Sequence, residues 1–422
     1  MNDAVTVSVP GDKSISHRAL ILAALARGRS TLRNVLNSAD IRSTASALRA
    51  LGVGIPEFTG PALAFEGRDL RGLLPASAAL DCGNSGTTAR LLMGVVAAQA
   101  FAAHFDGDNS LRSRPMRRVT QPLTLMGARI RELGQPDRLP LEVQGGPLHE
   151  IDILNEKSSA QVKSAVLLAA IAGGVRAKIR EPVHSRDHTE RMLTALGVEL
   201  RTVVEAGEMC IEVDPVNSLR PLDLDVPGDF SSAAFFLARG LLHGPRVRVA
   251  DVGVNATRTG LLDVIRRMHG AVHVSDRRVS EHEPIATLIA EPSSLRGVHV
   301  EAAEIPHLID EIPIVAILAA RAEGESTVSG AGELRVKETD RLSSLAANLR
   351  AVGAHAEEDG DTLRIQGSDA PLRGRVRTGG DHRIAMAFGV LGSIPGNDIE
   401  IDDVACVDVS FPSFWQQLPA GR

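Results

Sequence analysis

The feature that most constrains the fold of this chain is a short pattern that recurs along most of its length. An apolar segment that ends in glycine followed by a small residue occurs five times, with the glycines at 52, 127, 197, 270 and 353. The intervals between these glycines are 75, 70, 73 and 83 residues. Each copy is typical of an amphipathic helix stopped by a C-terminal glycine and followed by a short strand, such as 198–202 or 272–275. Six units of about 70 residues would fill the 422-residue chain, with the degenerate segment 411–418 as the sixth.

A second, longer repeat divides the chain near its middle. The sequence VPGD occurs at 9–12 and again at 226–229, 217 residues later, and each copy leads into an apolar helix predicted at 14–26 or 231–242. Proline followed by glycine marks a turn, and two similar turns can arise by chance, but the matching helices favour two pseudo-equivalent halves. A chain of this length also exceeds the roughly 250–300 residues of one core. We therefore expect an α/β (α+β) protein with two domains of three units each, at 10–226 and at 1–9 plus 227–422.

Composition excludes several classes of function. The 46 basic and 52 acidic residues give a net charge of −6, which argues against general nucleic-acid binding. Cys82, Cys210 and Cys406 form no Cys-x-x-Cys pair, which argues against disulfides and cysteine metal sites and suits a reducing cytoplasm. The near-apolar stretches 91–103 and 165–175 are shorter than the roughly 20 residues that span a bilayer, and no signal peptide is visible. We expect a cytoplasmic protein with neither membrane nor nucleic acid as a partner.

Two segments of the first half place chemistry at a predicted helix start. The sequence GDKSISHR at 11–18 puts Lys13 and Arg18 beside the positive end of a helix, where an anion would be held. It is not a Walker loop, because an aspartate and not a glycine precedes the lysine. The sequence DCGNSGTTAR at 81–90 opens a predicted helix at 90–103, and its Gly86 would let a ligand approach the backbone. A capped helix with surface charges and an ordinary glycine turn are the alternative interpretations.

Three further segments of the first half carry polar side chains that could bind an anion. In RSRPMRR at 112–118 Arg114 precedes a proline, which favours an extended backbone, and a guanidinium grips a carboxylate or phosphate with two bonds. The sequence SSAQVK at 158–163 precedes a predicted helix at 164–172, and SRDHTER at 185–191 begins another. A solvated basic loop and ordinary helix capping would explain the same residues.

In the second half, carboxylates occur among apolar residues. Asp310 stands at the entrance of a predicted buried helix at 314–320, either as a cap or as a carboxylate placed in a site. In RVKETDRL at 335–342, a helix would put Lys337 and Arg341 on one face with Glu338 between them. The sequence DHR at 381–383 leads into a predicted helix at 384–391. Helix starts of this kind that converge on a cleft between the domains would attract small substrates that carry phosphate and carboxylate groups.

Together these motifs closely resemble the 5-enolpyruvylshikimate-3-phosphate synthase family. They occur in the family's order from Val9 to Phe414, and the octapeptides at 11–18 and 335–342 are the most specific. The resemblance implies the enolpyruvyl transferase-like fold, in which two domains of three βαβαββ units each close on the substrates, with the active site in the interdomain cleft. This agrees with the six units inferred from the repeats.

The resemblance also implies a reaction and a set of site residues. The family transfers the enolpyruvyl group of phosphoenolpyruvate to the 5-hydroxyl of shikimate 3-phosphate, without metal or organic cofactor, and is the target of the herbicide glyphosate; we expect a monomer. Carried over residue by residue, shikimate 3-phosphate would be held by Ser14, Arg18, Ser159, Gln161, Arg186 and Lys337. Phosphoenolpyruvate would be held by Lys13, Gly86, Arg114, Gln161, Arg341 and Arg383. The catalytic residues would be Asp310, which contacts the shikimate hydroxyls and accepts a proton, Glu338 at the methylene carbon, and Lys13 at the departing phosphate.

The chain departs from the family pattern at some positions. Val409 precedes the terminal Ser-Phe-Pro where many members have a lysine, and Ala160 and Glu333 replace a serine and an asparagine of other members. The nearest alternative is the UDP-N-acetylglucosamine enolpyruvyl transferase, which shares the fold but typically carries a catalytic cysteine on a mobile loop. Cys82 lies in a predicted strand before the glycine turn and is a poor candidate for that role. A non-catalytic anion-binding protein and an RNA-end-processing relative are the alternatives of another class.

Overall fold

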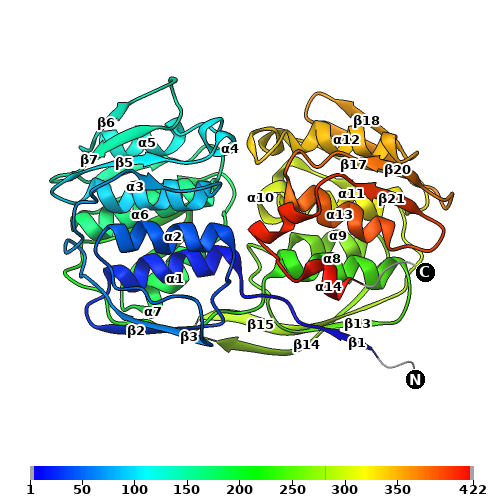
Figure 1. The fold of residues 1–422 in the computed structure, drawn as a ribbon, viewed down its shortest axis with the longest axis horizontal. Helices are drawn as coiled ribbons and strands as arrows, with labels where there is room; N and C mark the ends of the chain where they lie inside the picture. The colour runs from blue at the N-terminus through cyan, green and yellow to red at the C-terminus, as the bar shows by residue number, and fades with distance from the viewer. Residues whose placement is uncertain (1–3, 281, 419–422) are drawn as a thin grey trace. The chain divides into compact units, whose positions relative to one another are not determined.

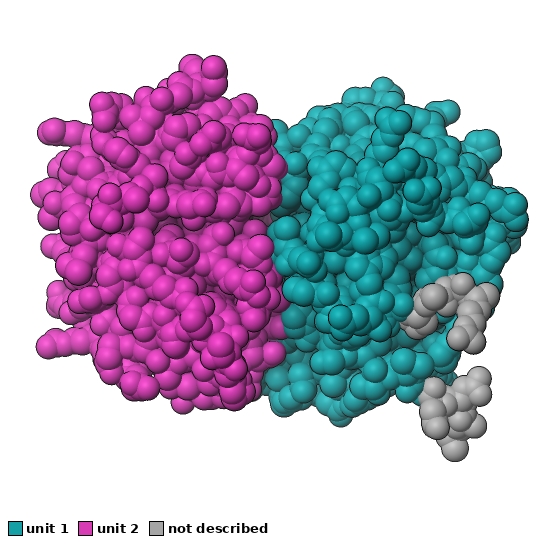
Figure 2. All heavy atoms as spheres, in the orientation of Figure 1, with its two compact units in different colours: residues 1–10, 227–422 teal, residues 11–226 magenta. Residues whose placement is uncertain are grey.

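The computed structural model describes residues 4–280 and 282–418, which fold as two compact units. Unit 1 comprises residues 1–10 and 227–422, and unit 2 comprises residues 11–226 (Figure 2). The chain therefore passes from one unit to the other within each of the two VPGD sequences. Residues 1–3, 281 and 419–422 of the predicted domain ranges lie outside the described residues.

Within its described residues, unit 2 contains three small sheets that share one plan (Figure 1). A parallel pair of strands forms one side of each sheet, and antiparallel strands extend it. The sheets are, in strand order, β12 (Asp223–Asp225), β2 (Arg29–Arg33) and β3 (Ala62–Glu66); β4 (Leu80–Asp81), β5 (Ala102–Asp106), β7 (Leu141–Gln144) and β6 (Arg129–Glu132); and β8 (Ile151–Leu154), β9 (Ala177–Glu181), β11 (Glu208–Val213) and β10 (Leu200–Glu205).

In the part of the chain that the structure describes, unit 1 repeats this plan in two sheets, and its third sheet is a parallel pair alone. Its sheets are β1 (Val5–Val7), β13 (Val247–Gly253), β15 (Glu283–Glu291) and β14 (Ala271–Ser280); β16 (His299–Val300), β17 (Glu325–Val328), β19 (Thr362–Gln366) and β18 (His355–Asp359); and β20 (Arg373–Val376) with β21 (Asp398–Ile401). Each again begins with a parallel pair. The repeated plan is the structural counterpart of the repeat in the sequence.

The first sheet of each unit borrows its outer strand from a distant part of the chain. In unit 1, β1 pairs in parallel with β13, about 240 residues later in sequence. In unit 2, β12 pairs in parallel with β2 in the same way. This pairing explains why the N-terminal segment belongs to the unit that is otherwise formed by the second half of the chain.

The helices pack into a separate apolar core in each unit. In unit 2, α1, α2, α3 and α6 lie side by side (Figure 1). Nearly every residue of α6 and α11 is buried, as expected of helices that are apolar on all sides. No helix among the described residues combines the length and apolarity that a membrane crossing requires.

The helices of unit 2 are α1 (Lys13–Leu25), α2 (Ala39–Ala50), α3 (Gly86–Ala97), α4 (Asn109–Arg112), α5 (Arg117–Leu125), α6 (Ala160–Gly173) and α7 (His188–Ala195). Those of unit 1 are α8 (Phe230–Leu242), α9 (Gly260–Arg267), α10 (Ile305–Leu308), α11 (Ile312–Ala320), α12 (Arg341–Ala351), α13 (His382–Gly392) and α14 (Phe414–Gln417).

Four of the five predicted helix-stopping glycines have the positive φ that ends a helix, namely Gly52, Gly127, Gly197 and Gly353. The prediction is wrong for Gly270, because α9 ends one residue earlier and His269 takes the left-handed position with φ 62°. Position 270 requires a glycine for a different reason, because a neighbouring side chain leaves no room for a Cβ atom. A Cβ atom at this position would lie 2.6 Å from Cγ2 of Ile265, which packs against it.

Two predicted helices are also corrected by the structure. The apolar run 90–103 is not one helix, because α3 covers Gly86–Ala97 and residues 102 and 103 already belong to β5. Apolar runs of this kind do not reveal by periodicity where a buried helix gives way to a buried strand. Lys337 and Arg341 do not share a helix face, because residues Gly332–Val336 form a 3₁₀ helix, Lys337 is extended, and α12 begins only at Arg341 behind the capping Asp340.

Candidate functional site

The start of α1 gathers predicted site residues in unit 2. The carboxylate of Asp12 caps the helix by accepting from the N–H of Ile15 at 2.9 Å, which makes Lys13 its first residue. The Lys13 ammonium forms an ion pair with Asp40, whose side chain is 6% exposed at the start of α2. The sequence reasoning missed Asp40, although an acidic residue in the first turn of a predicted helix was a visible signal.

Arg18 lies one turn further along α1 and is almost fully buried. Its guanidinium donates to Oγ1 of Thr189 at 2.7 Å, to Oγ of Ser164 at 2.7 Å and to the carbonyl of Ser14 at 2.9 Å. These bonds join α1 to the first turns of α6 and α7. The structure thus holds Ser14 and Arg18 beside the starts of three helices.

A second cluster in unit 2 surrounds Gly86 at the start of α3. Gln161 accepts from Nη1 of Arg90 at 2.9 Å and donates to Oγ1 of Thr87 at 2.9 Å. A Cβ atom on Gly86 would lie 2.5 Å from Nη1 of Arg90 and 3.4 Å from Nη1 of Arg114. The glycine therefore leaves room for two guanidinium groups. Arg90 was not among the predicted site residues, although it lies four residues after Gly86 and hence on the same helix face.

Two loops of unit 2 carry the remaining predicted residues of this half. Ser159 stands at the N-cap of α6, where its side chain makes no capping bond. Arg186 lies in the loop between β9 and α7. Both loops are attached to the buried carboxylate of Glu181, through Asn155 at 2.7 Å and through the N–H of Ser185 at 3.0 Å.

In unit 1, Arg341 stands at the centre of the predicted residues. Its Nε donates to Oδ2 of Asp381 at 2.7 Å, Nη2 pairs with the carboxylate of Glu338, and Nη1 lies 3.5 Å from Oδ1 of Asp310. Arg383 donates from Nη1 to the carbonyl of Asp310 at 3.0 Å, and its Nε lies 3.8 Å from the Asp310 carboxylate. The structure therefore brings Asp310, Glu338, Arg341 and Arg383 together. The buried Asp381 also belongs to this cluster. From its position before the predicted helix 384–391, only a capping role could be inferred.

The carboxylates around Arg341 keep its side chain positively charged. Burial by itself lowers the pKa of Arg341, but the charges of Asp381, Glu338 and Asp310 outweigh it, so the pKa lies above its ordinary value. Arg341 is therefore a permanent cation between carboxylates. A permanent cation in this position can bind an anion. The two partly accessible carboxylates beside it can move protons to and from a bound molecule.

The cations of the segment 335–341 have different surroundings. Arg335 forms ion pairs with Asp340 at 3.0 Å, Glu358 at 2.7 Å and Asp361 at 3.2 Å, whereas Arg341 is buried in the cluster described above. Lys337 lies between them in the extended residues before α12. The motif therefore contributes Lys337, Glu338 and Arg341 as site candidates, while Arg335 holds the fold.

Two further features limit the chemistry. Burial raises the pKa of the Cys82 thiol and the side chain is inaccessible, so this cysteine is not a nucleophile. Among residues 4–280 and 282–418, no group of three His, Cys, Asp or Glu side chains is arranged to hold a metal ion.

Comparisons with known proteins show what this chain is similar to. Residues 4–418 match the family model of EPSP synthase (3-phosphoshikimate 1-carboxyvinyltransferase). The 3-phosphoshikimate 1-carboxyvinyltransferases of Salinibacter ruber and Geobacter metallireducens are 46% and 42% identical over 417 and 413 residues, covering 98% of this chain and 96% and 95% of theirs. The structure of EPSP synthase from Acinetobacter baumannii is similar with a TM-score of 0.83 and 36% identity, over 99% of this chain and 95% of that one. The enolpyruvyl transferase NikO from Streptomyces tendae, at 18% identity, shares the fold with a TM-score of 0.75 over 99% of this chain and 94% of that one.

Proposed function

This chain belongs to the EPSP synthase (3-phosphoshikimate 1-carboxyvinyltransferase) family, and on that premise we propose how its residues carry out the reaction. The enzyme transfers the enolpyruvyl group of phosphoenolpyruvate to the 5-hydroxyl of shikimate 3-phosphate and releases phosphate, in the shikimate pathway of aromatic amino-acid biosynthesis. The predicted family and the two-domain α/β fold of enolpyruvyl transferases are confirmed. The single observation that carries the assignment is the family match over residues 4–418. The UDP-N-acetylglucosamine reaction is not favoured, because the buried Cys82 cannot supply its cysteine.

The proposed substrate sites draw on both units. Shikimate 3-phosphate is held by Ser14, Arg18, Ser159, Gln161 and Arg186 of unit 2 and by Lys337 of unit 1. Phosphoenolpyruvate is held by Lys13, Gly86, Arg114 and Gln161 of unit 2 and by Arg341 and Arg383 of unit 1. The interdomain location of the active site, which the family resemblance implies, stays a prediction. The monomeric state and the location in the cytoplasm stay predictions.

The reaction is an addition followed by an elimination. The 5-hydroxyl oxygen forms a bond to C2 of phosphoenolpyruvate while its proton passes to the carboxylate of Asp310, and C3 takes a proton from the carboxyl group of Glu338. In the elimination, Glu338 takes a proton back from C3 and the bond from C2 to the phosphate oxygen breaks. Asp310 gives up the proton of the hydroxyl as the departing phosphate takes one up, so both carboxyl groups end as they began. Lys13 stabilises the departing phosphate. Each proton transfer by a positioned group accelerates such a step by about 10²–10⁴-fold.

The assignment is tested by measuring phosphate release from the purified protein. We expect release only when shikimate 3-phosphate and phosphoenolpyruvate are both present, because phosphate leaves from an adduct of the two. Reactions that omit either substrate are the controls. Equal turnover with UDP-N-acetylglucosamine in place of shikimate 3-phosphate, or no turnover at all, would contradict the assignment.

A methyl group at Gly86 should weaken phosphoenolpyruvate binding. The added Cβ of Gly86→Ala would lie 2.5 Å from Nη1 of Arg90, so this guanidinium must shift, and the methyl group would narrow the space proposed for phosphoenolpyruvate beside Gly86. If the substrate loses one hydrogen bond to a charged group, its KM should rise by about tenfold or more. Steady-state kinetics with each substrate varied in turn measure this. Gly54→Ala, where a Cβ atom meets nothing within 4 Å, is the matched control, and an unchanged KM in Gly86→Ala would refute the role of this glycine.

A further inference from the structure

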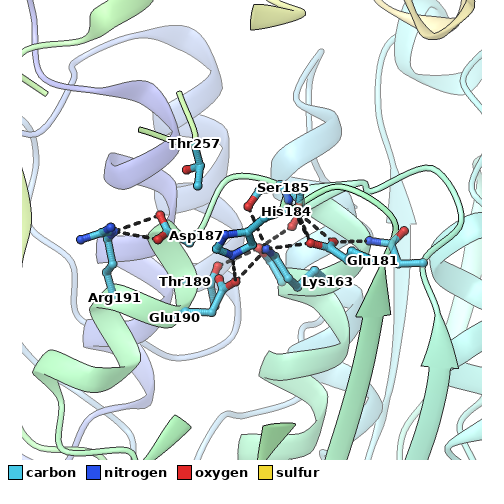
Figure 3. A network of polar contacts seen from close by, with 12 residues as sticks. Lys163, Glu181, His184, Ser185, Asp187, Thr189, Glu190, Arg191 and Thr257 are labelled. Carbon is cyan, nitrogen blue, oxygen red and sulfur yellow. Dashed lines mark hydrogen bonds and ion pairs between the residues drawn. The ribbon is translucent and has the colours of Figure 1, made fainter. Parts of the chain in front are cut away.

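A lysine is buried with two glutamates in unit 2 (Figure 3). We name Lys163, Glu181 and Glu190 the Lys163 cluster. The side chains of Lys163 and Glu181 are 0% exposed and that of Glu190 is 7% exposed. The Lys163 ammonium lies 2.7 Å from Oε1 of Glu190 and 3.2 Å from Oε2 of Glu181, and it donates to the carbonyl of Ser185 at 3.0 Å. Three oxygen atoms therefore surround the ammonium: those of Glu181 and Ser185 accept hydrogen bonds, and that of Glu190 forms an ion pair.

The position of this lysine is costly for a helix. Lys163 is the fourth residue of α6, close to the positive end of the helix dipole, where a cation is unfavourable. Buried ion pairs also stabilise a fold little, since apolar side chains of similar volume often serve as well. Burial lowers the pKa of Lys163, but the charges of Glu190 and Glu181 outweigh it and hold the pKa above its ordinary value. The lysine therefore remains charged at neutral pH in a place where stability alone does not favour it.

The Lys163 cluster is attached to the loop that ends in Ser159. The carboxylate of Glu181 accepts from Nδ2 of Asn155 at 2.7 Å. The Asn155 side chain also binds the backbone of Ser159, since it donates to the Ser159 carbonyl at 3.0 Å and accepts from its N–H at 3.2 Å. Through Asn155, the cluster fixes the backbone that carries the Ser159 hydroxyl.

The Lys163 cluster is also hydrogen-bonded to the loop that carries Arg186. The hydroxyl of Ser185 donates to Oε1 of Glu181 at 2.8 Å, and its N–H donates to Oε2 at 3.0 Å. The carbonyl of the same residue accepts from Lys163. Every backbone and side-chain polar group of Ser185 is thus bound to the cluster, and Arg186 is the next residue of the chain.

The third connection leads to Arg18. The ion pair between Lys163 and Glu190 joins α6 to α7, and the hydroxyls of the neighbouring Ser164 and Thr189 lie 2.7 Å apart beside it. Both hydroxyl oxygens accept hydrogen bonds from the Arg18 guanidinium. The ion pair therefore sets the spacing of the two oxygens that orient this arginine.

We propose that the Lys163 cluster is a positioning device that sets Arg18, Ser159 and Arg186 in the geometry that binds shikimate 3-phosphate. This rests on the proposed function, which assigns these three residues to that substrate. Of the unit 2 residues proposed for phosphoenolpyruvate, Arg114 is bound by Asn84 at 2.6 Å, and Gln161, which is proposed for both substrates, is bound by Arg90 and Thr87; these bonds do not involve the cluster. Loss of the cluster should therefore weaken the binding of one substrate and spare the other.

Two variants separate positioning from stability. Glu190→Gln leaves Lys163 and Glu181 as a neutral pair and should remain folded, but it removes the closest anion from the ammonium. The triple variant Lys163→Met, Glu181→Gln, Glu190→Gln leaves no unpaired buried charge, while the Ser185 carbonyl loses its donor. The matched control is Lys178→Met, because Lys178 of β9 also pairs with two glutamates, Glu205 of β10 at 2.8 Å and Glu212 of β11 at 3.0 Å, and neither belongs to the Lys163 cluster.

The readouts are the two KM values, binding of shikimate 3-phosphate by calorimetry, and the Tm. We expect the KM and Kd for shikimate 3-phosphate to rise about tenfold in both variants, as for the loss of one hydrogen bond to a charged group, with the KM for phosphoenolpyruvate within threefold of wild type. Lys178→Met should leave both KM values unchanged. A folded variant with an unchanged KM for shikimate 3-phosphate, an equal rise in both KM values, or unfolding of both variants would overturn the proposal. Failure of the wild-type protein to bind shikimate 3-phosphate would instead refute the proposed function.

Discussion

Asp310→Asn should lower kcat by about 10²–10⁴-fold while the protein remains folded. The carboxylate of Asp310 is proposed to accept the proton of the 5-hydroxyl, and an amide of the same shape cannot do so. The fold should persist because Arg341 keeps its ion pairs with Asp381 and Glu338 when the more distant contact at 3.5 Å loses its charge. Phosphate release at saturating substrates measures kcat, and thermal melting checks the fold.

The matched control for this variant is Asp361→Asn. Asp361 also contacts an arginine, Nε of Arg335 at 3.2 Å, but it is exposed and lies outside the cluster of Arg341. Its kcat should equal that of wild type. A kcat for Asp310→Asn within threefold of wild type would remove Asp310 from the mechanism.

Lys13→Met should lower kcat by about 10²–10³-fold, the effect of removing one group that stabilises charge on a departing oxygen. The same substitution leaves the Asp40 carboxylate, which is 6% exposed, without its cation. Removing one partner of a buried pair typically costs about 3–5 kcal/mol of stability, so the single variant should also melt at a lower temperature.

The double variant Lys13→Met, Asp40→Asn separates the two effects. It removes both charges, so the Tm should recover while kcat stays low. Lys157→Met, at an exposed lysine of the same unit, is the control for loss of a lysine as such. Recovery of kcat together with the Tm would show that Lys13 acts only through stability, and its proposed role at the phosphate would then be withdrawn.

Several features of this protein could be predicted from its sequence because they depend on neighbouring residues. The glycines 52, 127, 197 and 353 end helices through local hydrogen bonds, and their spacing identified the repeated plan that the sheets follow. The predicted helix ends were wrong at two places where one sequence pattern fits two different structures. Gly270 follows the same pattern but is required by the packing of Ile265, and the run 90–103 conceals the change from α3 to β5.

The partners of the site residues could not be predicted in this way. Asp40, Asp381 and Arg90 are ordinary polar residues near helix starts, and only the folded chain shows that they contact Lys13, Arg341 and Gln161 respectively. The segment 335–341 shows the same limit. Its arginines look alike in sequence, yet Arg335 pairs with surface carboxylates and Arg341 is buried among the proposed catalytic ones.

The sequence by itself determined the family, the repeated architecture and the types of residue available for binding anions, because motifs and periodicity are properties of neighbours along the chain. The tertiary structure decided which cations are paired and with what. The interaction energy of a charged side chain depends on its burial and on the opposite charges near it. Residues as distant in sequence as Arg18 and Thr189, or Lys163 and Glu190, come into contact only when the helices pack.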